Sequence, residues 1–160
     1  MIALRGGDVD GIDGIDQSDA HLRNLAARTE LAEALAKAGQ SAEGLAALDE
    51  CEAPSAELGG FAPEFLRVRG ELLLLQTAHA AAKPSEALFM QALDFARQQG
   101  ALSLALRAAT SLARLLSSQG RHAEAIARLQ PVYNRFTEGF ATADLIAARQ
   151  LLDDLDSGRR

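Results

Sequence analysis

The sequence predicts an all-α fold in which short helical hairpins stack side by side. Alanine and leucine dominate the apolar residues, whereas valine occurs three times, isoleucine five times, and aromatic residues make up 4% of the chain. Because strands favour β-branched and aromatic side chains, this composition disfavours a sheet. Apolar residues also recur at three- and four-residue steps, and glycines or prolines separate the periodic segments. We therefore expect helices joined by tight turns.

The clearest hairpin covers residues 101–136. Gly120 divides it, since glycine readily takes the left-handed conformation that ends a helix. Pro131 is predicted to kink or break the second helix, because proline lacks an N–H group and clashes with the preceding turn. The apolar side of the first helix is Leu102, Ala105, Leu106, Ala109, Leu112, Ala113 and Leu116, and that of the second is Ala123, Ile126, Leu129, Val132 and Phe136.

Residues 1–17 are rich in glycine and aspartate and show little periodicity, which predicts a flexible acidic linker. Their aspartates do not form an EF-hand. Counting from Asp8, the sixth position is Asp13, where the calcium loop requires glycine. The remaining residues, 18–160, are predicted to form one helical domain, a size that supports a sizeable core.

The first hairpin of this domain is predicted to begin with a helix over residues 20–38, capped by Ser18 or Asp19. Ser41 is expected to cap a second helix that stops before Pro54. Small polar residues with this placement satisfy the free N–H groups of a first helical turn.

Residues 54–62 are predicted to form a loop, after which Pro63 suits the first turn of a third helix. This helix is apolar on more than one face, which places it in the middle of the stack. Pro84 is expected to open a fourth helix that ends at Gly100. The apolar residues of the third helix are Phe65, Leu66, Val68, Leu72, Leu73, Leu74 and Leu75.

The last helix is predicted to begin after Thr142 as N-cap, with Asp144 near the positive end of the helix dipole. Its apolar stripe is narrow, and its C-terminal end is charged. One apolar side and one polar side are typical of the cap of a helical stack. The stripe consists of Leu145, Ala148, Leu152 and Leu155.

Small residues recur at corresponding positions of three hairpins. In the first helices these are Ala32, Gly70 and Ala113, and in the second helices Gly44, Ser85 and Ala125. A small residue lets neighbouring helices approach, and a large one nearby fills the space between them. The large residues that follow at a fixed distance are Leu35, Leu73 and Leu116 in the first helices, and Leu48, Phe89 and Leu129 in the second.

This pattern resembles degenerate tetratricopeptide repeats, without the tryptophan and tyrosine usual in that family. The resemblance implies a right-handed superhelix of about three αα-hairpins plus a C-terminal capping helix. A narrower resemblance, to the C-terminal helical region of bacterial signalling ATPases linked to adenylate or guanylate cyclase domains or to winged-helix regulators, covers residues 25–155. It is carried by the strings LRVRGELLL, ALRAATSLARL, GRHAEAIARLQPVY and FTEGFATADLIAARQLLDDL.

That narrower resemblance implies a regulatory tail with no catalytic site of its own. The sequence contains no G-x-x-x-x-G-K-[ST] phosphate loop, so any ATPase or cyclase activity is expected outside this chain. The net charge of −6 disfavours binding to nucleic acid. No apolar run is long enough to span a membrane, and the N-terminus has no signal-peptide-like apolar region. With the single Cys51, these features predict a cytoplasmic protein.

No catalytic, cofactor-binding or metal-binding residues can be assigned. His21, His79 and His122 lack the spacing of a metal site, and Cys51 is either a small core residue or a reactive thiol. Four residues near the C-terminus either face a ligand or pack the sixth helix against the cap. They are Pro131, Tyr133, Phe136 and Phe140.

A binding surface follows from the resemblance, because the first helices of tetratricopeptide repeats line the concave side. Arg67, Arg107 and Arg114 would form a basic cluster there, and the guanidinium fork suits carboxylates. An acidic or C-terminal peptide would be the ligand. The alternative is a solvated face with local ion pairs, such as Arg67 with Glu71. The residues predicted for this face are Thr29, Glu33, Lys37, Arg67, Glu71, Arg107, Thr110 and Arg114.

We therefore expect a non-catalytic module that binds a protein or peptide partner and acts as a scaffold in signal transduction. The alternatives are a structural domain that self-associates as a homodimer through an exposed helix face, and a stand-alone adaptor. An independent enzyme ranks last, because no catalytic constellation is present.

Overall fold

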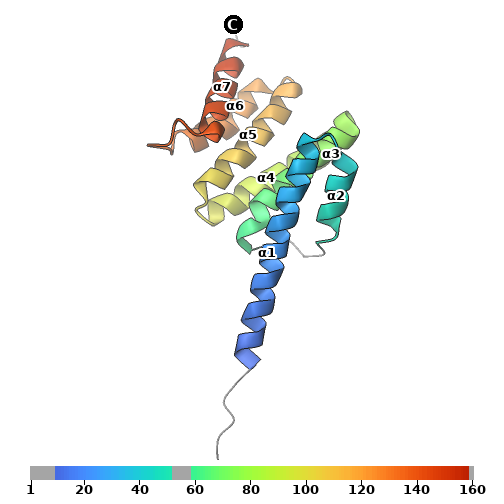
Figure 1. Ribbon diagram of the computed structural model, residues 1–160. Coiled ribbons are helices and arrows are strands. Elements are labelled where there is room, and N and C mark those ends of the chain that lie inside the picture. The colour runs from blue at the N-terminus through green and yellow to red at the C-terminus, as the bar shows by residue number, and fades with distance from the viewer. Residues whose placement is uncertain (1–9, 52–58, 159–160) are drawn as a thin grey trace, which may run out of the picture.

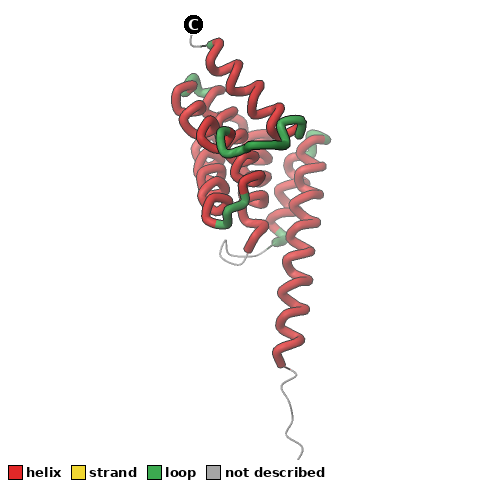
Figure 2. Tube along the Cα trace, turned by 90° about the vertical axis from the view of Figure 1, so that its left-hand side faces the viewer, coloured by secondary structure: helices red, strands yellow, loops and turns green. Residues whose placement is uncertain are grey.

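The computed structural model describes residues 10–51 and 59–158 of the chain. In these residues it contains seven α-helices, two short 3₁₀-helices and no strand (Figures 1 and 2), which confirms the predicted all-α class. No described helix is both long and apolar enough to cross a lipid bilayer. The elements are α1 Asp10–Lys37, α2 Ser41–Asp49, η1 Gly59–Phe61, α3 Ala62–Thr77, η2 Ala78–Ala81, α4 Ala82–Gln98, α5 Leu102–Ser118, α6 His122–Tyr133 and α7 Ala143–Ser157.

Helix α1 begins at Asp10, well before the predicted start near Ala20. The linker predicted over 1–17 is therefore wrong for residues 10–17, and neither Ser18 nor Asp19 is a cap. Glycine and aspartate are weak helix formers, but acidic residues near a helix N-terminus complement the helix dipole. Both views show this part of α1 extending away from the other helices (Figures 1 and 2). Residues 1–9 lie outside the described part of the chain.

Helix α2 is present as predicted, but Ser41 is its first residue and not its cap. Gln40 occupies the N-cap position without a side-chain hydrogen bond. Helix α2 ends at Asp49. Pro54 and most of the predicted loop lie outside the described residues.

Three of the helix reversals share one turn geometry. Gly39, Gly100 and Gly120 adopt positive φ angles of 77°, 68° and 75°. A Cβ atom at any of them would meet nothing within 4 Å, so it is the backbone conformation that favours glycine there. The residue after each glycine donates its N–H to a carbonyl five residues back, which is the Schellman motif. These bonds are Gln40 to Leu35 (2.8 Å), Ala101 to Ala96 (2.9 Å) and Arg121 to Leu116 (2.9 Å).

The two middle helices match the prediction with one exception. Pro63 lies in the first turn of α3 and Pro84 in the first turn of α4. Leu72 is fully buried, but Leu75 is 60% exposed. The prediction that this helix is buried on all its apolar faces is wrong at Leu75, because successive helical residues point about 100° apart and the side chain of Leu75 lies on a face without a neighbouring helix.

The C-terminal helices are close to the prediction. Helix α6 continues through Pro131 to Tyr133, so of the two predicted effects, a kink or a break, the break is wrong. Thr142 is the N-cap residue of α7, but its side chain makes no capping hydrogen bond. The predicted stripe of α7 is confirmed, since all four of its residues are buried. They are Leu145, Ala148, Leu152 and Leu155.

The helices pack in a regular order. Each α-helix contacts the next one along the chain, and the odd-numbered helices α1, α3, α5 and α7 also contact one another in sequence. No such contact joins the even-numbered helices among the described residues. The odd-numbered helices thus form a continuous row, with α5 packed against α3, α4, α6 and α7.

The recurrent small residues lie where helices approach each other. Ser85 of α4 donates its hydroxyl to the carbonyl oxygen of Gly70 in α3 at 2.9 Å. A Cβ atom on Gly70 would lie 2.6 Å from Cε1 of Phe89. In the first hairpin, a Cβ atom on Gly44 would lie 3.2 Å from the carbonyl oxygen of Ala32. Small side chains are therefore required at both helix crossings.

Candidate functional site

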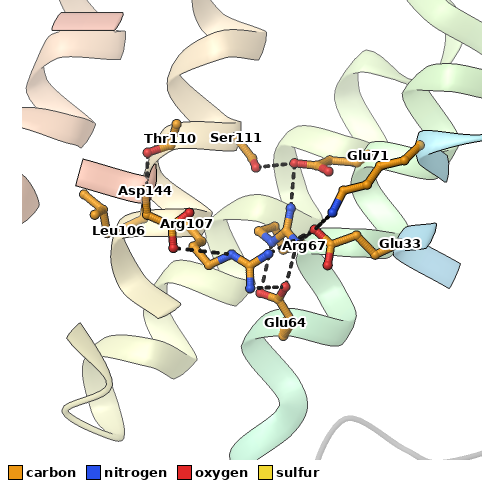
Figure 3. A network of polar contacts seen from close by, with 10 residues as sticks. Glu33, Glu64, Arg67, Glu71, Leu106, Arg107, Thr110, Ser111 and Asp144 are labelled. Atoms are coloured by element: carbon orange, nitrogen blue, oxygen red, sulfur yellow. Dashed lines mark hydrogen bonds and ion pairs between the residues drawn. The ribbon is translucent and has the colours of Figure 1, made fainter. Parts of the chain in front are cut away.

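Five of the eight predicted face residues meet in one ion-pair network on the row of odd-numbered helices (Figure 3). We call it the central network. Helix α1 supplies Glu33 and Lys37, α3 supplies Arg67 and Glu71, and α5 supplies Arg107. The sequence interpretation missed Glu64 of α3 and placed Asp144 of α7 only at the helix dipole. The members are Glu33, Lys37, Glu64, Arg67, Glu71, Arg107 and Asp144.

Arg67 is the centre of this network, with a side chain only 5% exposed. Its guanidinium lies 3.1 Å from Glu33 (Nη2 to Oε1), 2.6 Å from Glu64 (Nη2 to Oε1) and 2.8 Å from Glu71 (Nη1 to Oε1). Burial acts to lower the pKa of Arg67, but the hydrogen bond to Glu64 and the three carboxylate charges raise it overall. Arg67 is therefore a structural cation, because its guanidinium is buried and already paired with three carboxylates of this chain.

Arg107 extends the central network to α5. Its Nη2 lies 3.0 Å from Oε1 of Glu33, and its Nη1 lies 2.8 Å from Oε1 of Glu64. Its Nε lies 3.9 Å from Oδ2 of Asp144. The alternative of a solvated face with local ion pairs holds only in part. Arg67 pairs with Glu71 on its own helix but is buried, and Arg107 pairs with carboxylates of other helices.

Glu33 forms ion pairs with three cations, and their charges shift its pKa. Partial burial acts to raise the pKa of Glu33, but Arg67, Arg107 and Lys37 lower it below its ordinary value of 4.5. The unfolded chain therefore binds this proton more readily than the folded chain. The stabilisation from Glu33 is complete above about pH 4.5 and is lost as the pH falls through the lower folded-state value.

We accordingly expect the free energy of unfolding to fall more steeply below about pH 4.5 in the wild type than in Glu33→Gln, which has no carboxyl group to titrate. Urea unfolding between pH 7 and pH 3 measures this difference. Glu43→Gln, a change at an exposed position of α2, is the control. Identical pH profiles for the wild type and Glu33→Gln would contradict the predicted role of Glu33.

The two predicted threonines do not present a binding group. Thr29 and Thr110 are both buried. Each hydroxyl donates at 2.8 Å to a carbonyl of its own helix, that of Leu25 or Leu106. Thr29, Arg67 and Thr110 each stand three residues before one of the recurrent small residues, so the repeat places all three inside the stack. Their assignment to an open binding face is corrected accordingly.

Arg114, the remaining predicted residue, lies at a groove between α3 and α5. This α3–α5 groove has a volume of about 680 Å³, and α4 contributes to its lining. Glu33, Glu71 and Arg114 each directly follow a recurrent small residue, so they are equivalent in the repeat, yet the third carries the opposite charge. The lining residues are Glu71, Leu74, Leu75, Ala82, Phe89, Ser111, Arg114, Leu115, Ser118 and Gln119.

A smaller hollow of about 370 Å³ lies beside the predicted aromatic residues. The rings of Tyr133 and Phe140 pack with their centroids 6.1 Å apart. Phe140 and Ile146 of this hollow are both exposed. The contact between Tyr133 and Phe140 agrees with the predicted packing role, and the ligand-facing role stays a prediction.

The remaining reactive side chains form no centre. No three histidine, cysteine or acidic side chains of the described residues come together in a way that could hold a metal ion. Cys51 is partly buried, and burial raises the pKa of its thiol, which keeps it protonated. His21 is exposed, and Nδ1 of His122 lies 3.5 Å from the Ser117 hydroxyl. The side chain of His79 lies outside the description.

The comparisons with known proteins return no relative. No protein-family model, no curated protein and no solved structure matches the chain. Functional inference therefore depends on the α3–α5 groove, the order of helix packing and the resemblance found in the sequence.

Proposed function

We propose that the chain is a non-catalytic protein-interaction module that binds a partner protein in the α3–α5 groove. The order of helix packing supports a curved stack, because the odd-numbered helices contact one another and the even-numbered helices do not. The hairpins α1–α2, α3–α4 and α5–α6 would form a right-handed superhelix capped by α7. The odd-numbered helices would line its concave side, as the first helices do in the repeats that the sequence resembles.

The observation that carries this proposal is the composition of the groove. Its volume of about 680 Å³ lies within the range of about 300–1,000 Å³ typical of ligand sites. Leucines from α3 and α5 line it together with Phe89 of α4, and Arg114 stands beside them. Ligand sites are lined mainly by apolar side chains, and Leu75, which lines this groove, is 60% exposed.

The wider setting that we propose is a regulatory tail of a bacterial signalling ATPase in the cytoplasm. The basis is the resemblance carried by FTEGFATADLIAARQLLDDL and the other three strings. In such a protein, occupation of the groove would bias the active state of a catalytic domain outside this chain. The partner in the groove would then be a regulator of that domain or a segment of the domain itself.

A photocrosslinking experiment in the native bacterium tests the interaction function. A photoreactive amino acid replaces Ser118 in the groove or Ala127, an exposed residue on α6. We expect a discrete crosslinked protein from position 118 and none from position 127, with identification by mass spectrometry. No protein crosslink from position 118, or the same crosslinks from both positions, would contradict the proposal.

Self-association is a second candidate function, supported by the smaller hollow. Phe140 is 49% exposed and Ile146 is 44% exposed beside it. If these side chains join two copies, sedimentation velocity should show dimers that increase with protein concentration. The double variant Phe140→Ser, Ile146→Ser should then sediment as a monomer. A wild-type chain that stays monomeric at every concentration would remove this candidate.

A further inference from the structure

The walls of the α3–α5 groove are mainly apolar, and the wall formed by α3 includes a largely exposed leucine. Leu74 and Leu75 project from α3, Leu115 lies on α5, and Phe89 and Ala82 of α4 complete the lining. Leu115 and Phe89 are buried and belong to the core, whereas Leu75 is exposed. A ligand must cover Leu75 to gain free energy from its burial.

The polar groups of the groove are nearly all engaged with this chain. Glu71 accepts from Ser111 at 2.6 Å and pairs with Arg67 at 2.8 Å. The hydroxyl of Ser118 donates to the carbonyl oxygen of Leu115, and Oε1 of Gln119 accepts from Arg121.

Arg114 is the exception among these polar groups. It is exposed, and no described residue lies within hydrogen-bond or ion-pair distance of its guanidinium. The groove therefore combines an apolar surface with one arginine that has no carboxylate partner among the described residues, in a chain whose net charge is −6.

From this combination we infer that the groove receives an amphipathic α-helix of a partner protein, with its apolar side against Leu74, Leu75 and Leu115 and an acidic side chain on Arg114. The inference rests on the proposed interaction function and specifies its ligand. An extended peptide would bring unpaired N–H and C=O groups against side chains that are already engaged. A helix satisfies its own backbone and requires no donors from the groove.

The width of the occupant also favours a helix over an alkyl carboxylate. A helix with its side chains is about 10–12 Å across, so it can contact the walls from α3 and α5 together and cover Leu75. An extended alkyl chain is narrower than a helix and would cover less of the surface around Leu75. Apolar residues three or four positions apart on the partner would provide the matching stripe.

Selection from a displayed library of helix-forming peptides tests the inference. On the wild-type chain we expect enrichment of peptides with two large apolar residues three or four positions apart and an aspartate or glutamate on the same face. On Arg114→Glu we expect lysine or arginine at the acidic position. Arg128→Glu, which has the same net charge but lies on α6, should select the wild-type pattern. Peptides without helical spacing, or one pattern on all three proteins, would overturn the inference.

Fluorescence anisotropy with the best selected peptide supplies the energetic readout. Leu75→Ser should weaken binding by about tenfold, because an apolar contact is lost. Leu31→Ser removes a leucine of α1 that is 52% exposed outside the groove, and it should leave binding unchanged. Arg114→Ala should weaken binding by about threefold at low salt, with a smaller effect at high salt. Equal affinities for Leu75→Ser and Leu31→Ser would overturn the inference.

Other occupants give distinguishable results. Displacement of the peptide by an equal concentration of dodecanoate would assign the groove to an alkyl carboxylate, and dimers abolished by Arg114→Glu would assign it to a second copy. Both outcomes overturn the inference. Crosslinks from position 118 together with selected peptides of no helical pattern would overturn the helical ligand but leave the interaction function intact. An absence of protein crosslinks would remove both.

Discussion

Replacement of Arg67 by methionine is expected to lower the free energy of unfolding by about 3 kcal/mol, near the lower end of the range for breaking a buried ion pair. The substitution leaves Glu33, Glu64 and Glu71 close together without the buried cation that pairs with all three. Arg107 still pairs with Glu33 and Glu64, and the carboxylates are partly exposed, so the loss stays near this lower end. Urea unfolding at pH 7 measures it, against a total of about 5–15 kcal/mol for a typical domain.

The matched control is Arg149→Met. Arg149 pairs with Asp153 four residues on, but both side chains are largely exposed, and solvent-screened pairs of this kind contribute little to stability. The double variant Arg67→Met, Glu64→Gln should recover part of the loss, since it removes one of the uncompensated charges. A cost for Arg67→Met no larger than that for Arg149→Met would show that the central network does not stabilise the stack.

The second large effect is expected at the crossing of α3 and α4. Gly70→Ala places a Cβ atom 2.6 Å from Cε1 of Phe89, closer than two non-bonded carbon atoms can approach. Over-packing of a core costs about 1–3 kcal/mol, whereas alanine gains about 1 kcal/mol over glycine in helix propensity. Gly70→Ala should therefore destabilise the chain by about 1 kcal/mol, and Gly70→Val, with a larger and β-branched side chain, by more. Thermal and urea unfolding measure both changes.

Gly60→Ala is the control for this prediction, because a Cβ atom there meets nothing within 4 Å. It should change stability by less than about 0.5 kcal/mol. The coupling to Phe89 provides a further check. Phe89→Leu is destabilising alone, but its cost should shrink when Gly70→Ala is already present, because the smaller side chain relieves the clash. Stabilisation by Gly70→Ala would mean that helix propensity outweighs packing at this position.

The sequence predicts those features of the fold that depend on local spacing. Gly39, Gly100 and Gly120 end their helices as expected, since the left-handed turn is a property of a few adjacent residues. The stripe of α7 likewise follows from three- and four-residue steps. The start of α1 at Asp10 is not predicted, because weak helix formers and favourable N-terminal charges have opposing effects there.

The candidate site shows the same division between local and distant contacts. The pair of Arg67 with Glu71 is predictable, because residues four apart on a helix are neighbours. The contact of Arg67 with Glu33 joins residues 34 positions apart, and no local pattern reveals it. Leu75 and Leu115 gain their place in the groove only from the way α3 and α5 pack. Arg114 was predicted on this face, but only the structure shows that no carboxylate of the described residues pairs with it.

The position of α5 has a consequence for local unfolding of the chain. This helix is clamped by α3 and α4 on the N-terminal side and by α6 and α7 on the other, whereas α1 and α7 have neighbours on one side alone. Local unfolding in a linear array costs least at its ends, where the fewest interfaces are lost. Local unfolding is therefore expected to begin at α1 or at α7. Helix α5 keeps one wall of the groove in place while either terminal helix is unfolded.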